Sequence, residues 1–147
     1  LNGQNIEAQI RDKAVSDFVS EVSSLEKVRT FLVRQQQAMG QQKGVVMDGR
    51  DIGTVVFPNA ELKLFVTANI DVRTQRRYAE LQAKGIPSTY EEVKQNLLER
   101  DRIDSTREIN PLRQAEDAIV IDTTHHTKDS QLQAVLNLIK DKGLIAG

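Results

Sequence analysis

The chain has 147 residues, of which 39% are hydrophobic and 28% charged, and 20 Lys+Arg against 21 Asp+Glu give a formal net charge of −1. This length and composition are typical of one globular domain. Zero Cys excludes a disulfide framework and a thiolate zinc site, and two histidines, His125 and His126, are too few for a His-rich metal site. The balanced charge and short apolar runs favour a soluble, cytoplasmic protein with no nucleic-acid or membrane partner.

The first half of the chain predicts two helices and then a strand. Apolar residues at helical spacing indicate a helix close to the N-terminus. A second helix is predicted from a capping box formed by Ser23 and Glu26 to a stop at Gly40. The wholly apolar residues 45–47 are typical of a strand buried on both faces of a parallel sheet, and this predicted strand ends at Asp48.

The second half alternates strands and helices. Strands are predicted over residues 62–66 and 118–121. The helices between and after them are predicted from Asn69 to Gly85, from a cap at Ser88 or Thr89 into the charged residues 99–108, and around residues 132–139. This order argues for βαβ units, so the expected fold class is α/β, with a parallel sheet sandwiched by helices in three layers.

The residues just after the first predicted strand are candidates for ligand binding, because ligands of open parallel sheets gather at the carboxyl ends of strands. Asp48 has the position of a carboxylate that holds nucleotide-bound Mg²⁺, usually through water; alternatively, it caps a turn. Gly49 permits close approach of a ligand to the backbone. Arg50 offers a planar charged fork suited to phosphate, or it forms a surface ion pair with Asp51.

The densest charge cluster lies at residues 99–107. If the predicted helix continues through it, Arg100, Asp104 and Arg107 share one face. Two interpretations stay open: a solvated face whose charges pair with one another, or a mobile arm whose arginines close over phosphates. Arg73 and Arg77, four residues apart on the preceding helix, allow the same two interpretations.

Residues 48–58, Asp-Gly-Arg-Asp-Ile-Gly-Thr-Val-Val-Phe-Pro, resemble the signature of bacterial cytidylate kinases. Further matching stretches follow in the family's order at 63–68, 73–77, 99–101, 110–112 and 121–124, so the resemblance spans essentially the whole chain. It implies an αβα nucleoside-monophosphate kinase of the P-loop class. The implied activity is transfer of the γ-phosphoryl group of ATP to CMP or dCMP, with Mg²⁺ as cofactor, by a protein that is a monomer at full length.

The resemblance also implies roles for individual residues. Those that bind CMP are Ser20, Arg29, Arg50, Asp51, Arg100, Asp104 and Arg107: Asp51, Arg107 and Arg29 for cytosine, Arg50 for the phosphate, and Ser20, Arg100 and Asp104 for the ribose. Those that bind ATP are Arg73, Arg77 and Thr124, and Asp48 lies on the Mg²⁺ side through water. The implied catalytic residues are Arg50, Arg77 and Arg100. His125 and His126 depart from the small or aliphatic residues usual in the family beside adenine.

The 147 residues contain no G-x-x-x-x-G-K-[ST] phosphate loop. In the family that loop precedes the matched segments, so the resemblance implies an N-terminally truncated chain. Residues 1–24 then belong to the CMP-binding insertion, 25–84 and 114–147 to the core, and 85–113 to the lid. Because the loop's strand would lie between two of the predicted strands, the isolated chain is expected neither to fold stably nor to catalyse.

Two other functions stay open from the sequence. Another P-loop kinase of small metabolites would share Asp48 and the lid, but it would not explain Arg50 and Asp51 together with the arginines of the charge cluster. A non-catalytic nucleotide-binding or interaction module would explain a chain without the phosphate loop.

Overall fold

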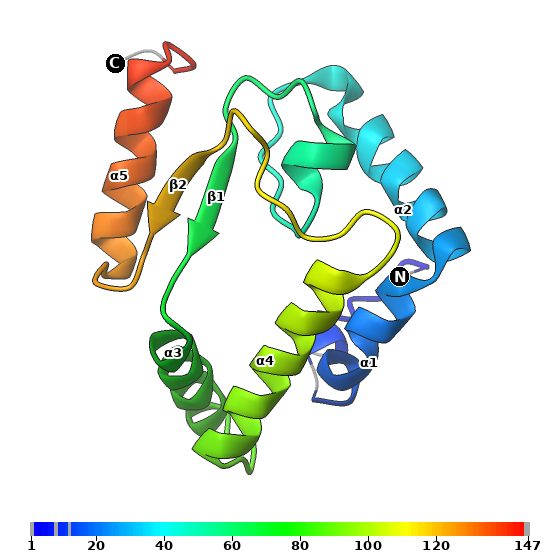
Figure 1. Cartoon of the computed structure of the whole chain (residues 1–147), viewed down its shortest axis with the longest axis vertical. Helices are drawn as coiled ribbons and strands as arrows, with labels where there is room; N and C mark the ends of the chain where they lie inside the picture. The colour runs from blue at the N-terminus through cyan, green and yellow to red at the C-terminus, as the bar shows by residue number, and fades with distance from the viewer. Residues whose placement is uncertain (1, 8, 12, 146–147) are drawn as a thin grey trace.

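The computed structural model describes residues 2–7, 9–11 and 13–145 (Figure 1). The elements, in chain order, are η1 (Gln9–Arg11), α1 (Lys13–Ser24), α2 (Glu26–Met39), η2 (Gly40–Gln42), η3 (Ile52–Val56), β1 (Leu64–Thr67), α3 (Ile70–Ala83), α4 (Tyr90–Thr106), β2 (Ile119–Asp122) and α5 (Lys128–Asp141). Both η1 and η2 are short 3₁₀ turns, whereas η3 is a single π-helical segment.

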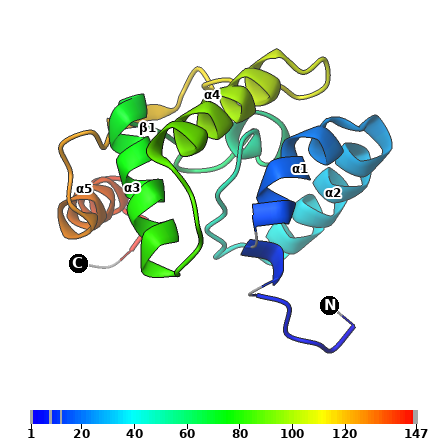
Figure 2. The ribbon, with the colours of Figure 1, turned by 90° about the horizontal axis from the view of Figure 1, so that it is seen from below.

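The sheet consists of β1 and β2, which pair in parallel from Leu64 opposite Ile119 to Thr67 opposite Asp122. α5 lies on one side of the molecule and the α1–α2 pair on the other, as the two ribbon views agree (Figures 1 and 2). α4 packs against both α3 and α1, and it therefore connects the sheet side with the α1–α2 side. The fold is mixed α/β with a small parallel sheet, as the order of the elements predicts.

Two of the three predicted strands are confirmed, with shifted ends, as β1 and β2. The predicted strand over residues 45–47 is wrong: the structure assigns no strand there, and Val46 is 97% exposed. A strand needs a neighbour for its N–H and C=O groups. Within the described residues β1 pairs with β2 alone, so residues 45–47 have no such neighbour.

The capping box predicted at Ser23 and Glu26 is also wrong. α1 continues through Ser24, and the Ser23 hydroxyl donates to the Ser20 carbonyl at 2.9 Å, a local side-chain bond that competes with capping. Leu25 occupies the N-cap of α2 and makes no side-chain cap bond. A single residue therefore separates the two helices.

α4 continues through the charge cluster to Thr106, beyond the point where its apolar pattern stops. The ion pair between Glu99 and Arg102 bridges one turn at 2.7 Å, which supports the helix from its exposed side. Asp104 faces inward and is 3% exposed. The helical continuation places Arg100 and Asp104 on one face, as their spacing predicts.

Thr89, rather than Ser88, forms the cap of α4. Its hydroxyl accepts from the Glu92 amide at 3.2 Å, and the Glu92 carboxylate accepts from the Thr89 amide at 2.8 Å. We expect Thr89→Ala to lower the free energy of unfolding by about 1 kcal/mol, because it removes a reciprocal capping box. Urea denaturation of the complete gene product measures this, with Ser88→Ala as the neighbouring control; equal losses in both variants would contradict the assignment.

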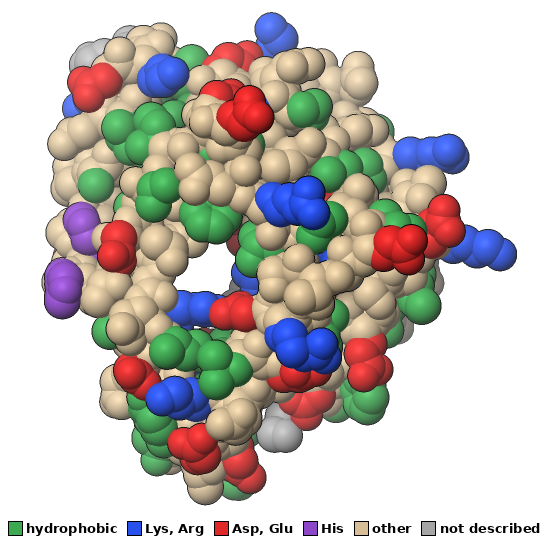
Figure 3. Space-filling model, viewed as in Figure 1, with side chains coloured by type: hydrophobic (Ala, Val, Ile, Leu, Met, Phe, Trp, Pro, Cys, Tyr) green, Lys and Arg blue, Asp and Glu red, His purple; other side chains and the backbone are tan. Residues whose placement is uncertain are grey.

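The buried residues of the described chain are more often polar than apolar. The buried apolar side chains are Val56, Leu81, Val93 and Ile121, and the buried polar ones are Ser20, Arg29, Asp51, Thr74, Asp104, Arg107 and Thr123. Figure 3 shows an opening through the molecule, and the same view in Figure 1 places β1, α3 and α4 around it. The centre of the fold is thus a polar cluster beside an opening.

Among the described residues, no helix is long and apolar enough to cross a membrane.

Candidate active site

A pocket of about 300 Å³ lies where α1, α2, the loop before η3 and the C-terminal part of α4 meet. Its walls combine charged and apolar side chains. The lining residues are Val19, Ser20, Ser23, Arg29, Leu32, Val33, Gln36, Gly49, Arg50, Asp51, Ile52, Arg100, Asp104 and Arg107. All seven residues that the resemblance implies for CMP are among them.

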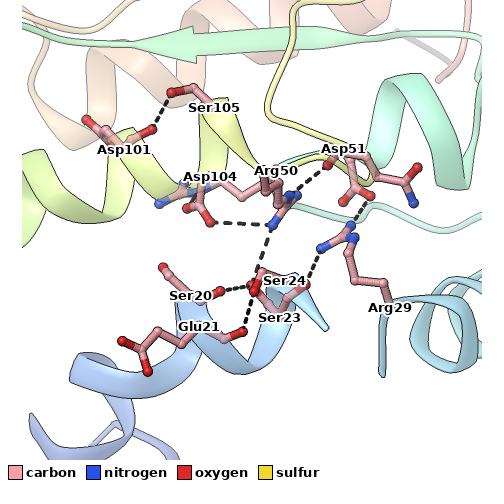
Figure 4. Close-up of polar contacts among 12 residues, drawn as sticks. Ser20, Glu21, Ser23, Ser24, Arg29, Arg50, Asp51, Asp101, Asp104 and Ser105 are labelled. Atoms are coloured by element: carbon pink, nitrogen blue, oxygen red, sulfur yellow. Dashed lines mark hydrogen bonds and ion pairs between the residues drawn. The ribbon is translucent and has the colours of Figure 1, made fainter. Parts of the chain in front are cut away.

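One wall of the pocket holds a buried ion pair between Arg29 of α2 and Asp51, which are 8% and 6% exposed (Figure 4). Arg29 Nη1 also donates to the Ser23 carbonyl at 3.1 Å, which ties α2 to the end of α1. The Asp51 carbonyl accepts hydrogen bonds from backbone N–H groups of η3, the shortest from Val55 at 2.9 Å. Asp51 is therefore fixed through its backbone by η3 and through its carboxylate by Arg29.

A second buried carboxylate, Asp104 of α4, lies between two arginines. Arg50 Nε donates to Asp104 Oδ2 at 2.8 Å, and Arg107 Nη1 donates to Oδ1 at 3.4 Å. Arg50 reaches Asp104 from the loop that precedes η3, so this contact connects that loop to α4. Arg50 and Asp51 do not form the surface ion pair that the sequence left open: each pairs with a residue far away in the chain.

The pocket has more positive than negative charge. Arg29, Arg50, Arg100 and Arg107 supply four guanidinium groups against the carboxylates of Asp51 and Asp104. In the described part of the protein three buried nitrogens, Arg29 Nε, Arg100 Nε and Arg107 Nη2, have no hydrogen-bond partner. Buried donors without a partner are costly, so these atoms indicate a place for a ligand rich in acceptors.

Burial, together with neighbouring positive charge, lowers the pKa values of two pocket arginines. Burial, followed by the charge of Arg50, lowers the pKa of Arg100. Burial, followed by the charge of Arg29, lowers the pKa of Arg107. A guanidinium stays protonated despite such shifts, so the site retains its positive charge at neutral pH. An anion entering the pocket would relieve both the repulsion and the unmet hydrogen bonds.

Residues 99–107 divide into exposed and pocket-lining side chains. Arg102 is exposed and pairs with Glu99, as expected of a solvated face. Arg100, Asp104 and Arg107 instead line the pocket. The solvated-face interpretation thus holds for Arg102 but not for the buried Asp104 and Arg107, and the interpretation as an arm that closes over phosphates stays a prediction.

The residues implied for ATP lie outside this pocket. Arg73 makes a two-point contact with Asp101, at 2.5 and 3.0 Å, which raises the Arg73 pKa through hydrogen bonding. Arg77 pairs with Glu80 at 2.9 Å. Thr124 Oγ1 donates to Asp122 at 2.6 Å and accepts from the Asn69 amide at 2.9 Å. These side chains belong to α3 and the loop after β2.

Asp48 is exposed, and the described residues contain no group of three His, Cys, Asp or Glu side chains that could hold a metal ion. This donor set does not form a protein cage. It is compatible with Mg²⁺ that keeps several waters and binds to substrate phosphates, since such an ion needs only one or two carboxylates.

Several lining residues were not predicted from the sequence. Leu32, Val33 and Gln36 follow Arg29 at spacings of three, four and seven, so helical periodicity from Arg29 could have found them.

Arg76 does not line the pocket, but it also was not predicted from the sequence. It donates to the Thr123 carbonyl at 2.6 Å and the His126 carbonyl at 3.1 Å, and it thus holds the loop after β2 against α3. No sequence pattern singled it out.

The fold and the pocket define an α/β protein with an arginine-rich pocket. The sequence pattern of the family described as cytidylate kinase matches residues 1–141, and the chain belongs to this family. Membership implies the P-loop nucleoside-monophosphate kinase fold.

Curated relatives agree with this assignment. The cytidylate kinase of Parabacteroides distasonis is 62% identical over 131 residues, which cover 89% of this chain and 57% of the relative. That of Flavobacterium johnsoniae is 57% identical over 141 residues, 96% of this chain and 61% of the relative. The chain thus spans about three-fifths of the length of these relatives.

Proposed function

We propose that the complete protein transfers the γ-phosphoryl group of ATP to CMP and dCMP, giving CDP and dCDP, and that the pocket between α1, α2 and α4 holds the monophosphate. The observation that carries this proposal is the set of three buried, unpartnered guanidinium nitrogens in a pocket with two surplus positive charges. A nucleoside monophosphate brings up to two negative charges and many acceptors, so it matches both features. The names of the relatives supply the substrate class.

Within this proposal Asp51 reads the base. The exocyclic amine of cytosine is a donor, whereas uracil has a carbonyl oxygen at that position. The Asp51 carboxylate, buried and held by Arg29, accepts from the amine and repels the carbonyl. Arg29 and Arg107 provide donors for the acceptor atoms of cytosine.

The phosphate and the ribose occupy the side of the pocket formed by α4. Arg50 binds the phosphate, while Ser20, Arg100 and Asp104 contact the ribose. The carboxylate oxygens of Asp104 are acceptors that suit a sugar hydroxyl. Arg50, Arg77 and Arg100 act as the catalytic residues by neutralising charge on the phosphoryl group in transfer. No covalent intermediate on the protein is required.

Arg73, Arg77 and Thr124 face ATP, and Asp48 holds Mg²⁺ through water. When bound, Mg²⁺ supplies charge neutralisation at the phosphates. The 147 residues contain no phosphate loop, so the proposal requires one from residues outside them. It also assigns the three-layer αβα core to residues 25–84 and 114–147, the remainder of the CMP-binding insertion to 1–24 and the lid to 85–113. The proposed enzyme is monomeric and cytoplasmic.

The test uses the complete gene product that contains these residues. Phosphorylation of CMP, dCMP, UMP and AMP by ATP is compared, together with equilibrium binding of each monophosphate. We expect kcat/KM for CMP to exceed that for UMP by at least about 100-fold, because a site built around a hydrogen-bonded amine rejects its analogue strongly. Equal activity with UMP would contradict the role of Asp51.

The same assays separate the two alternatives. CMP binding without phosphorylation would favour a non-catalytic nucleotide-binding module. Phosphorylation of another small metabolite without CMP binding would favour a different P-loop kinase. The upstream coding sequence adds a cheap check, because a Gly-rich loop ending in Gly-Lys-[Ser/Thr] is expected there for the enzyme.

A further inference from the structure

The segment after α4 holds a non-glycine residue in the left-handed region. Asn110 has φ 51°, and Pro111 follows it. Asn tolerates this conformation better than most residues, but the conformation is still uncommon outside glycine, and a following proline restricts the backbone further. A conformation of this kind persists only when surrounding contacts fix it. The Asn110 side chain makes no hydrogen bond in the described chain, so the residue acts through its backbone.

The contact that this conformation creates is to Arg107. The Asn110 carbonyl accepts from Arg107 Nε at 2.8 Å. The remaining hydrogen bonds of the Arg107 guanidinium are longer: Nη1 lies 3.4 Å from Asp104 Oδ1 and 3.5 Å from Ser23 Oγ. The Leu112 amide, which donates to the Asp104 carbonyl at 2.7 Å, closes the same turn against α4.

The three side-chain nitrogens of Arg107 therefore have different surroundings. Nε is held by the Asn110 carbonyl, Nη1 contacts the polar wall of the pocket, and Nη2 is buried without a partner. Because a guanidinium is planar, holding Nε fixes the direction in which Nη2 points. The shortest of these contacts depends on the left-handed Asn110.

We propose that Asn110 is a positioning residue of the monophosphate site: its left-handed backbone directs a carbonyl onto Arg107 Nε and so keeps Arg107 Nη2 free and aimed at the ligand. This inference rests on the proposed function, because the ligand is the monophosphate. Asn110 itself touches no substrate. The property that matters at position 110 is the ability to adopt φ near +50°, so glycine should replace Asn110 and β-branched residues should not.

The experiment compares Asn110→Gly, Asn110→Ala and Asn110→Val in the complete gene product, with CMP binding by titration calorimetry and steady-state kinetics. We expect Gly to retain CMP affinity. Ala and Val should weaken it by about fivefold to thirtyfold, the ratio that corresponds to the cost of the left-handed region for these residues. The KM for CMP should rise in the Ala and Val variants but not in the Gly variant. The KM for ATP and kcat at saturating CMP should stay within about twofold, because Arg107 is the group disturbed.

A merely structural role would give a different pattern. It would lower kcat through a smaller folded fraction, with unchanged KM values and a lower melting temperature. Should Val fail to fold, the comparison of Gly with Ala still decides. Equal CMP binding by the unaltered protein, Gly and Ala variants would overturn the inference about Asn110, whereas no CMP binding by the unaltered protein would overturn the proposed function instead.

Discussion

Replacing Asp51 with Ala should lower kcat/KM for CMP by at least about 100-fold, because it removes the acceptor that we propose for the cytosine amine and leaves the Arg29 charge buried without a carboxylate. Asp51 and Arg29 are 6% and 8% exposed, so water can compensate little. Breaking a buried pair by removing one partner costs about 3–5 kcal/mol. Part of that cost should appear as a lower melting temperature, so kinetics and thermal unfolding are measured on the same sample.

Two further substitutions make this result specific. Asp51→Asn keeps the shape and one acceptor oxygen but loses the charge, so it should retain more stability than Ala while still losing preference for CMP over UMP. Asp141→Asn, on the exposed end of α5, should change neither quantity. If the Ala variant at position 51 kept its preference for CMP, the base-reading role would be wrong.

Arg100→Met should lower activity without lowering thermal stability. Arg100 is half-buried, its Nε has no partner in the described chain, and burial together with Arg50 lowers its pKa. Removing the guanidinium should lower kcat by about 10²–10³-fold, the typical loss of one charge-stabilising donor. The ligand-free protein should be at least as heat-stable as the unaltered one, because methionine keeps the aliphatic stem and removes an uncompensated charge.

Arg102→Met is the matched control for Arg100→Met. Arg102 lies two residues away on the same helix, but it is exposed and pairs with Glu99. Its loss should leave kcat unchanged. A fall in melting temperature for Arg100→Met, accompanied by full activity, would show that Arg100 is a structural residue rather than a catalytic one.

Local signals in the sequence predicted most of the helices and both observed strands. The Thr89 cap, the Asn69 start of α3 and the apolar runs around β1 and β2 act over a few residues, so they can be recognised without the fold. The strand prediction at residues 45–47 was wrong because it depended on a contact that is not local. Whether an apolar run forms a strand depends on a neighbour that is distant in the chain.

The candidate site divides in the same way. Arg100 and Asp104 could be placed on one face from helical spacing, and the resemblance predicted the other residues of the proposed monophosphate site. The pairing of Arg29 with Asp51, and of Arg50 with Asp104, could not be predicted, because it depends on how α2 and α4 approach the loop before η3. The contribution of Asn110 was hidden for another reason: it comes from a carbonyl group, which every residue possesses.

The surplus of two positive charges in the pocket also affects events before any contact forms. A concave site with excess cationic charge attracts a dianionic ligand from solution and raises the rate of encounter. This attraction extends over roughly the screening length, about 8 Å at physiological ionic strength. Added salt should therefore slow capture of the monophosphate more than it speeds release, since release is governed by short contacts that ions screen poorly. If the proposed function is correct, the arginines that hold the monophosphate would thus also guide its arrival.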